Sequence, residues 1–284
     1  MLSRIVWLGA LAATAWAQEA VTKNVELFGE KIYYQEAGSG PDVILLHGLG
    51  GDRSNWGPTV PALAGKYHVL VPDQVGFGES DKPEINYRVA TLVDFLNAFY
   101  KKLGISKATL VGNSLGGWVA MDFTLAYPEK VTRLVLVDCA GYSQSRTGGP
   151  PLTRERMLAL NPGTIEGTKQ LMSVVFYNKA FATEGVAEAA FTRHLHKNDS
   201  PTINSFIDSI LRGEDVVDGK LGGIKVATLI VWGREDALIR LAAAKALGED
   251  IAGSETVVLD SCGHVPQVEC AGPFNTALLK FLGQ

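Results

Sequence analysis

The stretch TLVGNSLGG, at residues 109–117, decides the fold. It begins as a short apolar, β-branched run typical of a buried strand, and continues as Gly-x-Ser-x-Gly around Ser114. A helix-like run from Trp118 to Ala126 follows. So tight a turn strains the backbone of the serine and requires residues without side chains two positions away on either side. The stretch therefore predicts a strand–turn–helix unit that leaves the Ser114 hydroxyl free above a sheet.

Similar apolar runs, none of them alternating, recur on both sides of this stretch. Short continuous β-branched runs are typical of strands that are covered on both faces. The expected strands are 43–46, 68–71, 109–111, 134–137, 228–231 and 256–259, with an edge hairpin at 25–27 and 32–34 and helices at 87–103, 241–247 and 274–281. The predicted class is α/β: a mainly parallel sheet flanked by helices.

One interval breaks the alternation of strands and helices. Between Val137 and Thr228 lie about ninety residues without a strong strand signal, far more than an ordinary crossover needs. Helix-like stretches fill this interval. We therefore predict a helical cap, or lid, at 143–219, inserted into a core formed by 18–142 and 220–284.

Residues 1–17 have the pattern of a secretory signal peptide. Arg4 supplies the positive charge, an apolar run follows, and Ala15-Trp16-Ala17 matches a small-residue cleavage site. The run is shorter than the ~20 residues that span a bilayer. We expect cleavage after Ala17, no stable membrane anchor afterwards, and a secreted or periplasmic protein.

Charge and composition exclude several classes of protein. With 26 Lys+Arg against 30 Asp+Glu, the chain lacks the excess of basic residues that nucleic acids or anionic membranes select for. Its 46% of hydrophobic residues is enough to bury a sizeable core. No C-x-x-C or H-E-x-x-H spacing offers a zinc site, so we predict neither a metal nor a cofactor.

The 3 cysteines are too few for a disulfide framework. Cys262 and Cys270 are close in sequence and would be able to bridge in an oxidising compartment. A cysteine beside a catalytic loop is more often a small buried hydrophobic residue. We therefore expect Cys262 and Cys270 to be unbridged.

A serine nucleophile needs a base, and His264 is the predicted one. It lies in SCGHVP, residues 261–266, just after the last expected strand. Loops at the carboxyl ends of parallel strands gather on one side of the sheet, so this loop can meet the serine turn. His68 lies in an apolar run and is expected to be structural, while His194 and His196 are expected at the surface of the cap.

The base in turn needs a carboxylate to orient it, and Asp236 is the predicted acid. It ends WGRED, residues 232–236, after the penultimate expected strand, and completes the chain order Ser, Asp, His. Two rivals are Glu235 beside it and Asp138 at the end of another expected strand.

Backbone amides are the donors expected to stabilise the negative charge on a substrate oxygen. Leu115 supplies one because it follows the nucleophile. Leu49 is the candidate for the second, in the loop HGLGGD at 47–52, where glycines allow a close approach of the backbone. His47 is expected to organise this loop by hydrogen bonds.

Together these motifs resemble the α/β-hydrolase superfamily, in the branch that carries a helical cap after the sixth strand. The resemblance covers nearly all of residues 25–281, and it implies a serine hydrolase that acts through an acyl-enzyme without a cofactor. The motifs that carry it are His47-Gly48, DQVGFGES at 73–80, Gly112 to Gly117, Trp232 to Asp236 and Gly263-His264.

Two branches of this superfamily resemble the chain further. The sequence from Gly112 to Gly117 and the cap are similar to those of carbon–carbon hydrolases of aromatic ring cleavage. Arg193, in the cap, is placed to mimic a cap arginine of that group. Those enzymes usually carry a tryptophan after the histidine, where this chain has Val265. The chain also resembles monoacylglycerol-lipase-like esterases, with a similar cap between Asn161 and Gly213.

The leader and Val265 favour the esterases. We therefore predict an exported hydrolase that cleaves small-to-medium acyl or lipid carboxylic esters, with water as second substrate. In this prediction Ser114, His264 and Asp236 form the triad, and Leu49 and Leu115 form the oxyanion hole. The alternatives are a carbon–carbon bond hydrolase of meta-cleavage type and a non-catalytic ligand-binding protein on the same fold.

Overall fold

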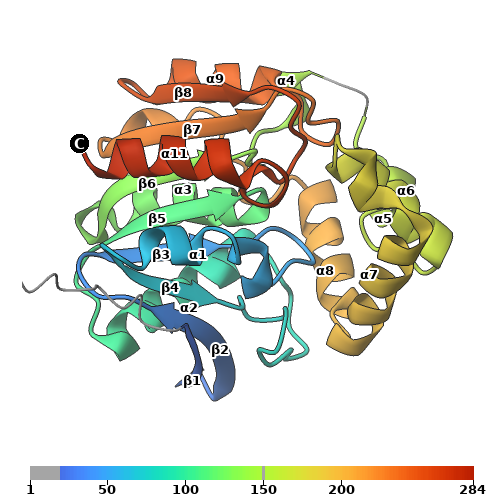
Figure 1. Cartoon of the computed structure of the whole chain (residues 1–284), viewed down its shortest axis with the longest axis horizontal. Coiled ribbons are helices and arrows are strands. Elements are labelled where there is room, and N and C mark those ends of the chain that lie inside the picture. The colour runs from blue at the N-terminus through green and yellow to red at the C-terminus, as the bar shows by residue number, and fades with distance from the viewer. Residues whose placement is uncertain (1–19, 149–150) are drawn as a thin grey trace, which may run out of the picture.

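A single mixed sheet forms the centre of the molecule (Figure 1). The computed structural model describes residues 20–148 and 151–284, so the predicted signal peptide at 1–17 lies outside the described residues. The eight strands lie in the order β1-β2-β4-β3-β5-β6-β7-β8. They are β1 (Val21–Leu27), β2 (Glu30–Ala37), β3 (Asp42–Leu46), β4 (His68–Pro72), β5 (Ala108–Asn113), β6 (Val131–Val137), β7 (Ala227–Gly233) and β8 (Glu255–Leu259).

Most neighbouring strands are parallel, as predicted. Only β2 runs against its neighbours, β1 and β4, and it forms the expected edge hairpin with β1. At the centre, Gly112 of β5 lies opposite Leu46 of β3 and Leu136 of β6. The loops that follow β3, β5, β6, β7 and β8 therefore emerge at one edge of the sheet.

Helices cover both faces of this sheet. The core helices are α1 (Val60–Leu63), α2 (Val89–Leu103), α3 (Leu115–Ala126), α9 (Ala242–Asp250), α10 (Pro266–Glu269) and α11 (Ala271–Leu282). Short 3₁₀ turns lie at Arg53–Trp56, Pro128–Lys130, Lys179–Ala182 and Leu221–Gly223. Ile44 and Leu46 of β3 pack with α2 and α3, whereas Val43 and Leu45 pack with α1 and α11. Both faces are thus apolar, which is why the strand sequences do not alternate.

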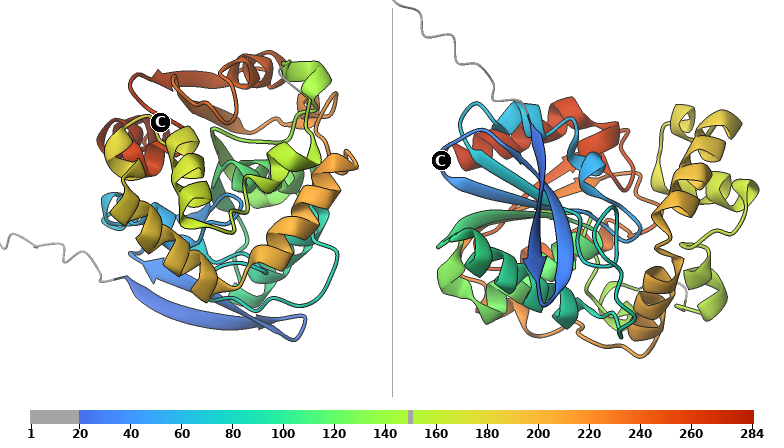
Figure 2. Two further views of the ribbon diagram at one scale, coloured as in Figure 1. Left: turned by 90° about the vertical axis from the view of Figure 1, so that its right-hand side faces the viewer. Right: turned by 90° about the horizontal axis from the view of Figure 1, so that it is seen from below.

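The insertion after β6 is helical and lies to one side of the core, beyond the carboxyl ends of the strands (Figure 2). Its helices are α4 (Gln144–Thr147), α5 (Arg154–Leu158), α6 (Ile165–Val175), α7 (Glu184–Lys197) and α8 (Ser200–Leu211). The Val217 N–H donates to the Gly141 carbonyl at 3.0 Å, so the two ends of the insertion meet. We retain 143–219 as the proposed limits of the cap.

Helix α8 attaches the cap to the core. Phe206 of α8 is buried and stacks on Phe77 with ring centroids 5.9 Å apart, and its ring lies 5.8 Å from that of Tyr87. The N–H of Tyr87 donates to the hydroxyl of Ser205 at 2.9 Å. The helix begins at Ser200, and Pro201 fits its first turn.

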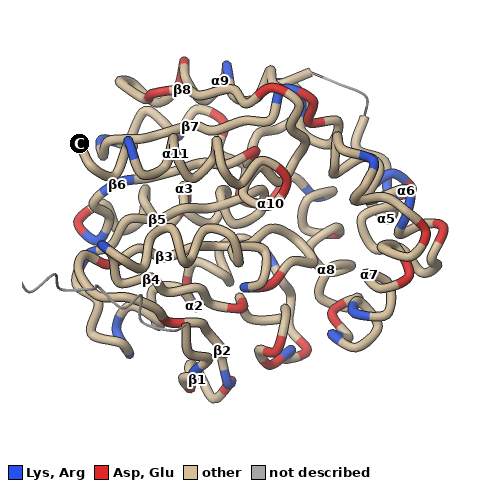
Figure 3. The backbone as a smooth tube through the Cα atoms, in the orientation of Figure 1, with Lys and Arg blue, Asp and Glu red and all other residues tan. Residues whose placement is uncertain are grey.

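Charged residues of both signs are scattered along the backbone around the molecule and over the cap, and the central strands contain few of them (Figure 3). The described residues contain no helix that is both long and apolar enough to span a bilayer.

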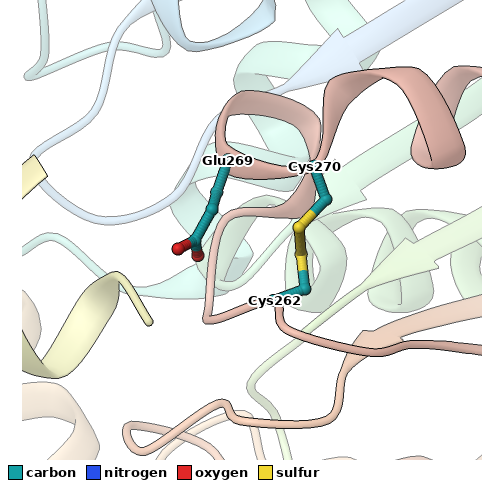
Figure 4. Close-up of side chains that lie close together, drawn as sticks. All are labelled: Cys262, Glu269 and Cys270. Atoms are coloured by element: carbon teal, nitrogen blue, oxygen red, sulfur yellow. A yellow bond between two sulfur atoms is a disulfide. The ribbon is translucent and has the colours of Figure 1, made fainter. Parts of the chain in front are cut away.

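A disulfide closes the loop that follows β8. Cys262 and Cys270 are bonded, with their Cα atoms 6.1 Å apart and a sequence separation of 8 (Figure 4). The expectation that these residues are unbridged is therefore wrong. The short helix α10 turns the chain back, so that Cys270 faces Cys262. We found no sequence pattern that predicts this turn. Cys139 is free and buried.

Replacement of the disulfide tests its contribution to stability. We expect the double variant Cys262→Ala, Cys270→Ala to lose about 2–3 kcal/mol of unfolding free energy, because the bridge restricts the unfolded chain over a short loop. Urea denaturation of both proteins, with and without dithiothreitol, measures this. Reductant should weaken the wild type to the level of the variant and leave the variant unchanged. Equal stability of the oxidised wild type and the variant would contradict the bridge.

Phe274 tests the packing of α11 on the sheet. It is 0% exposed, and its ring lies 6.1 Å from that of Trp56. We expect Phe274→Ala to lower the unfolding free energy by about 3–5 kcal/mol, because it leaves a cavity between helix and sheet. Phe28→Ala is the matched control, since Phe28 is 70% exposed, and urea denaturation should show a small change there. Similar losses in both variants would reject this packing argument.

Candidate active site

Ser114 stands at the turn between β5 and α3, where the sequence predicts it. Its backbone is left-handed, with φ 54° and ψ −117°, and its N–H donates to the Val137 carbonyl at 3.0 Å. A Cβ on Gly112 would lie 2.3 Å from the carbonyl oxygen of Gly116, and a Cβ on Gly116 would lie 2.3 Å from that of Leu46. The two glycines are therefore required by contact of backbone with backbone.

The structure brings Asp236 and His264 together. The imidazole Nδ1 lies 2.8 Å from Asp236 Oδ2, and the residues are 6% and 4% exposed. The other oxygen of Asp236 accepts the N–H groups of Leu238 at 2.8 Å and Ile239 at 2.9 Å. A carboxylate held in this way fixes the ring and directs the proton to Nδ1. The second nitrogen, Nε2, is then left with a lone pair to accept a proton.

Asn113 ties the histidine loop to the serine turn. Its side-chain amide donates to the His264 carbonyl and to the Val137 carbonyl, both at 3.1 Å. This places His264 beside the residue that precedes Ser114. Within the described residues, the Ser114 hydroxyl forms no hydrogen bond to His264. In unliganded enzymes such contacts are often long and tighten when substrate binds.

The two rival carboxylates have other partners. Glu235 accepts the N–H of Cys262 at 2.9 Å and so helps to fix the loop that carries His264. Asp138 is fully buried and accepts the N–H of Gly233 at 2.9 Å. Asp236 is thus the carboxylate that contacts the ring nitrogen of His264.

The two candidate oxyanion amides lie on either side of the serine turn. Leu115 is the first residue of α3, so its N–H has no partner within the helix. In the described chain, the Leu49 N–H likewise donates to no other backbone group. A Cβ on Gly48, next to Leu49, would lie 3.1 Å from Ser114 Cβ, which places this loop against the serine.

His47 organises the loop after β3, as the sequence analysis predicts. Its Nδ1 lies 2.8 Å from the Gly48 carbonyl, and its Nε2 accepts the N–H of Gln74 at 3.0 Å. Burial is the main cause that lowers the pKa of His47. Its ring is therefore a neutral structural group with both nitrogens engaged.

The remaining candidates lie away from the serine. His68 contacts Asp42 at 2.7 Å as a structural residue. His194 lies 3.1 Å from Ser200 Oγ within the cap, and His196 is exposed. Arg193, the possible cap arginine, is exposed on α7 and forms no ion pair with any described residue.

Glu269 is a contact between the cap and the histidine loop that sequence reasoning missed. Beside the disulfide (Figure 4), its carboxylate accepts the N–H of Gly263 at 2.7 Å and those of Tyr177, at 3.2 Å, and Asn178. The N–H of His264 itself donates to the carbonyl of Val175, at the end of α6, at 2.7 Å. The cap is thus hydrogen-bonded directly to the segment that carries the base.

Relatives of known name show what the chain is similar to. It is 32% identical over 277 residues to a 2-hydroxy-6-oxononadienedioate/2-hydroxy-6-oxononatrienedioate hydrolase from Klebsiella pneumoniae, covering 89% of this chain and 91% of the relative. A solved meta-cleavage product hydrolase from Pseudomonas fluorescens is 31% identical with a TM-score of 0.82, covering 92% and 97%. A solved bacterial membrane phospholipase A is 27% identical with a TM-score of 0.81, covering 93% and 86%.

These relatives overturn the predicted function of an exported carboxylic-ester hydrolase. The more similar ones carry the names of carbon–carbon hydrolases, which favours the alternative stated in the sequence analysis. The error has a chemical reason: an elbow serine, a histidine–aspartate pair and two amides serve both reactions. Val265 was the argument against the alternative, and similarity along almost the whole chain outweighs that single residue.

The fold and the sequence agree on the family. The family described as alpha/beta hydrolase fold matches residues 41–270, which span β3 to α10 and include the serine turn and the histidine loop. The mainly parallel sheet with helices on both faces is the architecture of that family. The chain belongs to the α/β hydrolase family and is a hydrolase of this fold.

Proposed function

We propose that this protein hydrolyses a carbon–carbon bond in a 2-hydroxy-6-oxo-diene acid, a vinylogous diketone of the meta-cleavage type. The observation that carries the proposal is the 32% identity, over 89% of the chain, with a hydrolase named for such a substrate. The geometry at Ser114, Asp236 and His264 supports it, because hydrolysis at a ketone also requires an activated nucleophile and stabilisation of an oxyanion.

The first step is attack on the ketone. His264 Nε2 takes the proton of the Ser114 hydroxyl while the oxygen bonds to the carbonyl carbon. Asp236, 2.8 Å from Nδ1, stabilises the imidazolium that forms. The carbonyl oxygen becomes an oxyanion, which the amides of Leu49 and Leu115 stabilise.

The second step breaks the carbon–carbon bond beside that carbonyl. This requires the keto tautomer of the substrate, in which the proton of the 2-hydroxyl group has moved to the carbon beside the ketone and the 2-position is a carbonyl. When the oxyanion collapses, the electron pair of the breaking bond is delocalised through the remaining double bond onto that 2-carbonyl oxygen, and the fragment departs as a dienolate. Imidazolium His264 supplies the proton to the departing carbon fragment. Ser114 then carries an acyl group, and water activated by His264 releases it as a carboxylic acid.

Variants of the proposed nucleophile and base test this mechanism. We expect Ser114→Ala and His264→Ala each to lower kcat on a synthetic 2-hydroxy-6-oxo-dienoate by about 10³–10⁶-fold, because the residues act as one proton-transfer unit. Cleavage shortens the conjugated system, so loss of the visible absorbance of the substrate measures the rate.

Two exposed cap residues provide matched controls for these variants. Ser173→Ala and His196→Ala change the same residue types away from the serine turn, and both should keep wild-type turnover. The wild-type protein should also prefer the dienoate over a series of p-nitrophenyl esters. Turnover of the esters together with an unchanged dienoate would reject the proposal.

We also propose that the protein acts outside the cytoplasm. The signal-peptide pattern at residues 1–17 and the Cys262–Cys270 disulfide support this, since structural disulfides persist in oxidising compartments. In bacterial cells that express the full chain, fractionation should recover it from periplasm or medium, with Gln18 as its first residue by N-terminal sequencing. Recovery of a chain with an intact leader from the cytoplasm would refute this localisation.

A further inference from the structure

A second buried carboxyl group lies behind the predicted acid. Asp138 follows β6 with a left-handed φ of 41° and is 0% exposed. Its N–H donates to the Val231 carbonyl at 3.1 Å, and its Oδ1 accepts the N–H of Gly233 at 2.9 Å. Its other oxygen, Oδ2, is buried and has no hydrogen-bond partner among the described residues. A buried carboxylate oxygen without a hydrogen-bond partner costs stability. Protonation would make this oxygen a hydrogen-bond donor, which can then pair with a neighbouring acceptor.

The neighbours of Asp138 are the groups of the predicted triad. One oxygen of Asp138, one of Asp236 and a ring nitrogen of His264 all lie within 4.8 Å of one another. The thiol of Cys139 is the other titratable group nearby, and it too is buried. No Lys or Arg of the described chain forms an ion pair with Asp138. The site thus offers Asp138 no Lys or Arg to balance a negative charge.

Two carboxylates this close and this deeply buried do not both ionise. Asp236 accepts three hydrogen bonds, from two backbone N–H groups and from His264. Asp138 accepts one. Burial raises the pKa of Asp138 well above its usual range, and the charge of Asp236 raises it further. The proton therefore belongs on Asp138.

We propose that Asp138 carries a proton in the resting enzyme and donates it to the carboxylate of Asp236, as a positioning residue for the Asp236–His264 pair. This rests on the proposed function, because it assigns Asp236 and His264 the roles given there. The donated hydrogen bond holds the Asp236 carboxylate in place from the side opposite the ring. It also draws negative charge away from the Asp236 oxygen that contacts His264.

The rate at which Ser114 reacts with a fluorophosphonate probe, followed from pH 5 to 9, tests this without any assumption about the substrate. Labelling needs a base that can accept the proton of Ser114, so the acid limb of the pH profile reports on the Asp236–His264 pair. Asp138→Ala removes the hydrogen-bond donor to Asp236 and should shift the acid limb of the labelling profile upward by about one pH unit. At a pH well below the limb, labelling of this variant should then be about tenfold slower than that of the wild type. Asp138→Asn keeps a neutral donor and should retain the wild-type limb.

Opposite outcomes would overturn the proposal. A limb that moves to lower pH in Asp138→Asn would mean that wild-type Asp138 is an anion that stabilises the imidazolium. An unchanged limb in Asp138→Ala would mean that Asp138 does not act on the pair. Asp122→Asn is the matched control. Asp122 lies on α3, and burial raises its pKa to about 6. Labelling of this variant should have the same acid limb as that of the wild type.

The protonation state has a second readout that does not use the active site. An acid whose pKa is raised by folding contributes most stability below its unfolded pKa of about 4, and that contribution is lost as pH rises toward the folded pKa. Asparagine does not titrate. Relative to the wild type, Asp138→Asn should therefore gain unfolding free energy steadily from pH 4 to 8 in urea denaturation.

The two readouts separate the two proposals. A difference in stability that is constant or falls with pH would refute a protonated Asp138, whatever the enzyme cleaves. A wild-type protein that is never labelled at Ser114 would refute the proposed function, and the stability measurement would still decide the state of Asp138.

Discussion

Contact of backbone with backbone around the serine turn is the constraint on which the rest of the site depends. Gly112 and Gly116 lie so close that a Cβ on either would be 2.3 Å from a carbonyl oxygen. That contact presses the start of α3 against β3 and β5 and holds Ser114 in a left-handed conformation. The first amide of α3 and the loop after β3 then flank the hydroxyl, because no side chain separates them. The proposed nucleophile and its proposed oxyanion donors are thus positioned by packing of the main chain.

The histidine is positioned by a different principle, attachment at many points. The disulfide closes its loop, and Glu235 accepts a hydrogen bond from the N–H of Cys262. The loop is also hydrogen-bonded to the cap through Glu269 and through the backbone of His264. Because the cap shares these bonds, a movement of the cap would also move the base.

The names of similar proteins and the geometry of the site answer different questions. The geometry says how a carbonyl group would be attacked: an elbow serine, a histidine oriented by Asp236 and two free amides. It is the same for an ester and for a ketone, so the bond that breaks depends on which substrate binds. The ester prediction failed at this point, because it relied on Val265 and on a leader sequence, neither of which takes part in the attack. Similarity over nearly the whole chain includes the cap and therefore carries information about the substrate that the motifs lack.

The sequence by itself determined the sheet, its mainly parallel direction, the helical insertion and the identity of Ser114, His264 and Asp236 as the residues to examine. Each of these follows from local pattern: runs of apolar residues buried on both faces, glycines around a serine, and polar residues just after strands. Only the tertiary structure decided that Cys262 and Cys270 bridge, that Glu269 bonds the cap to the histidine loop, and that Asp138 lies against the triad. These are contacts between segments distant in sequence or joined by an irregular turn, and a one-dimensional pattern does not encode the directions in which such side chains point.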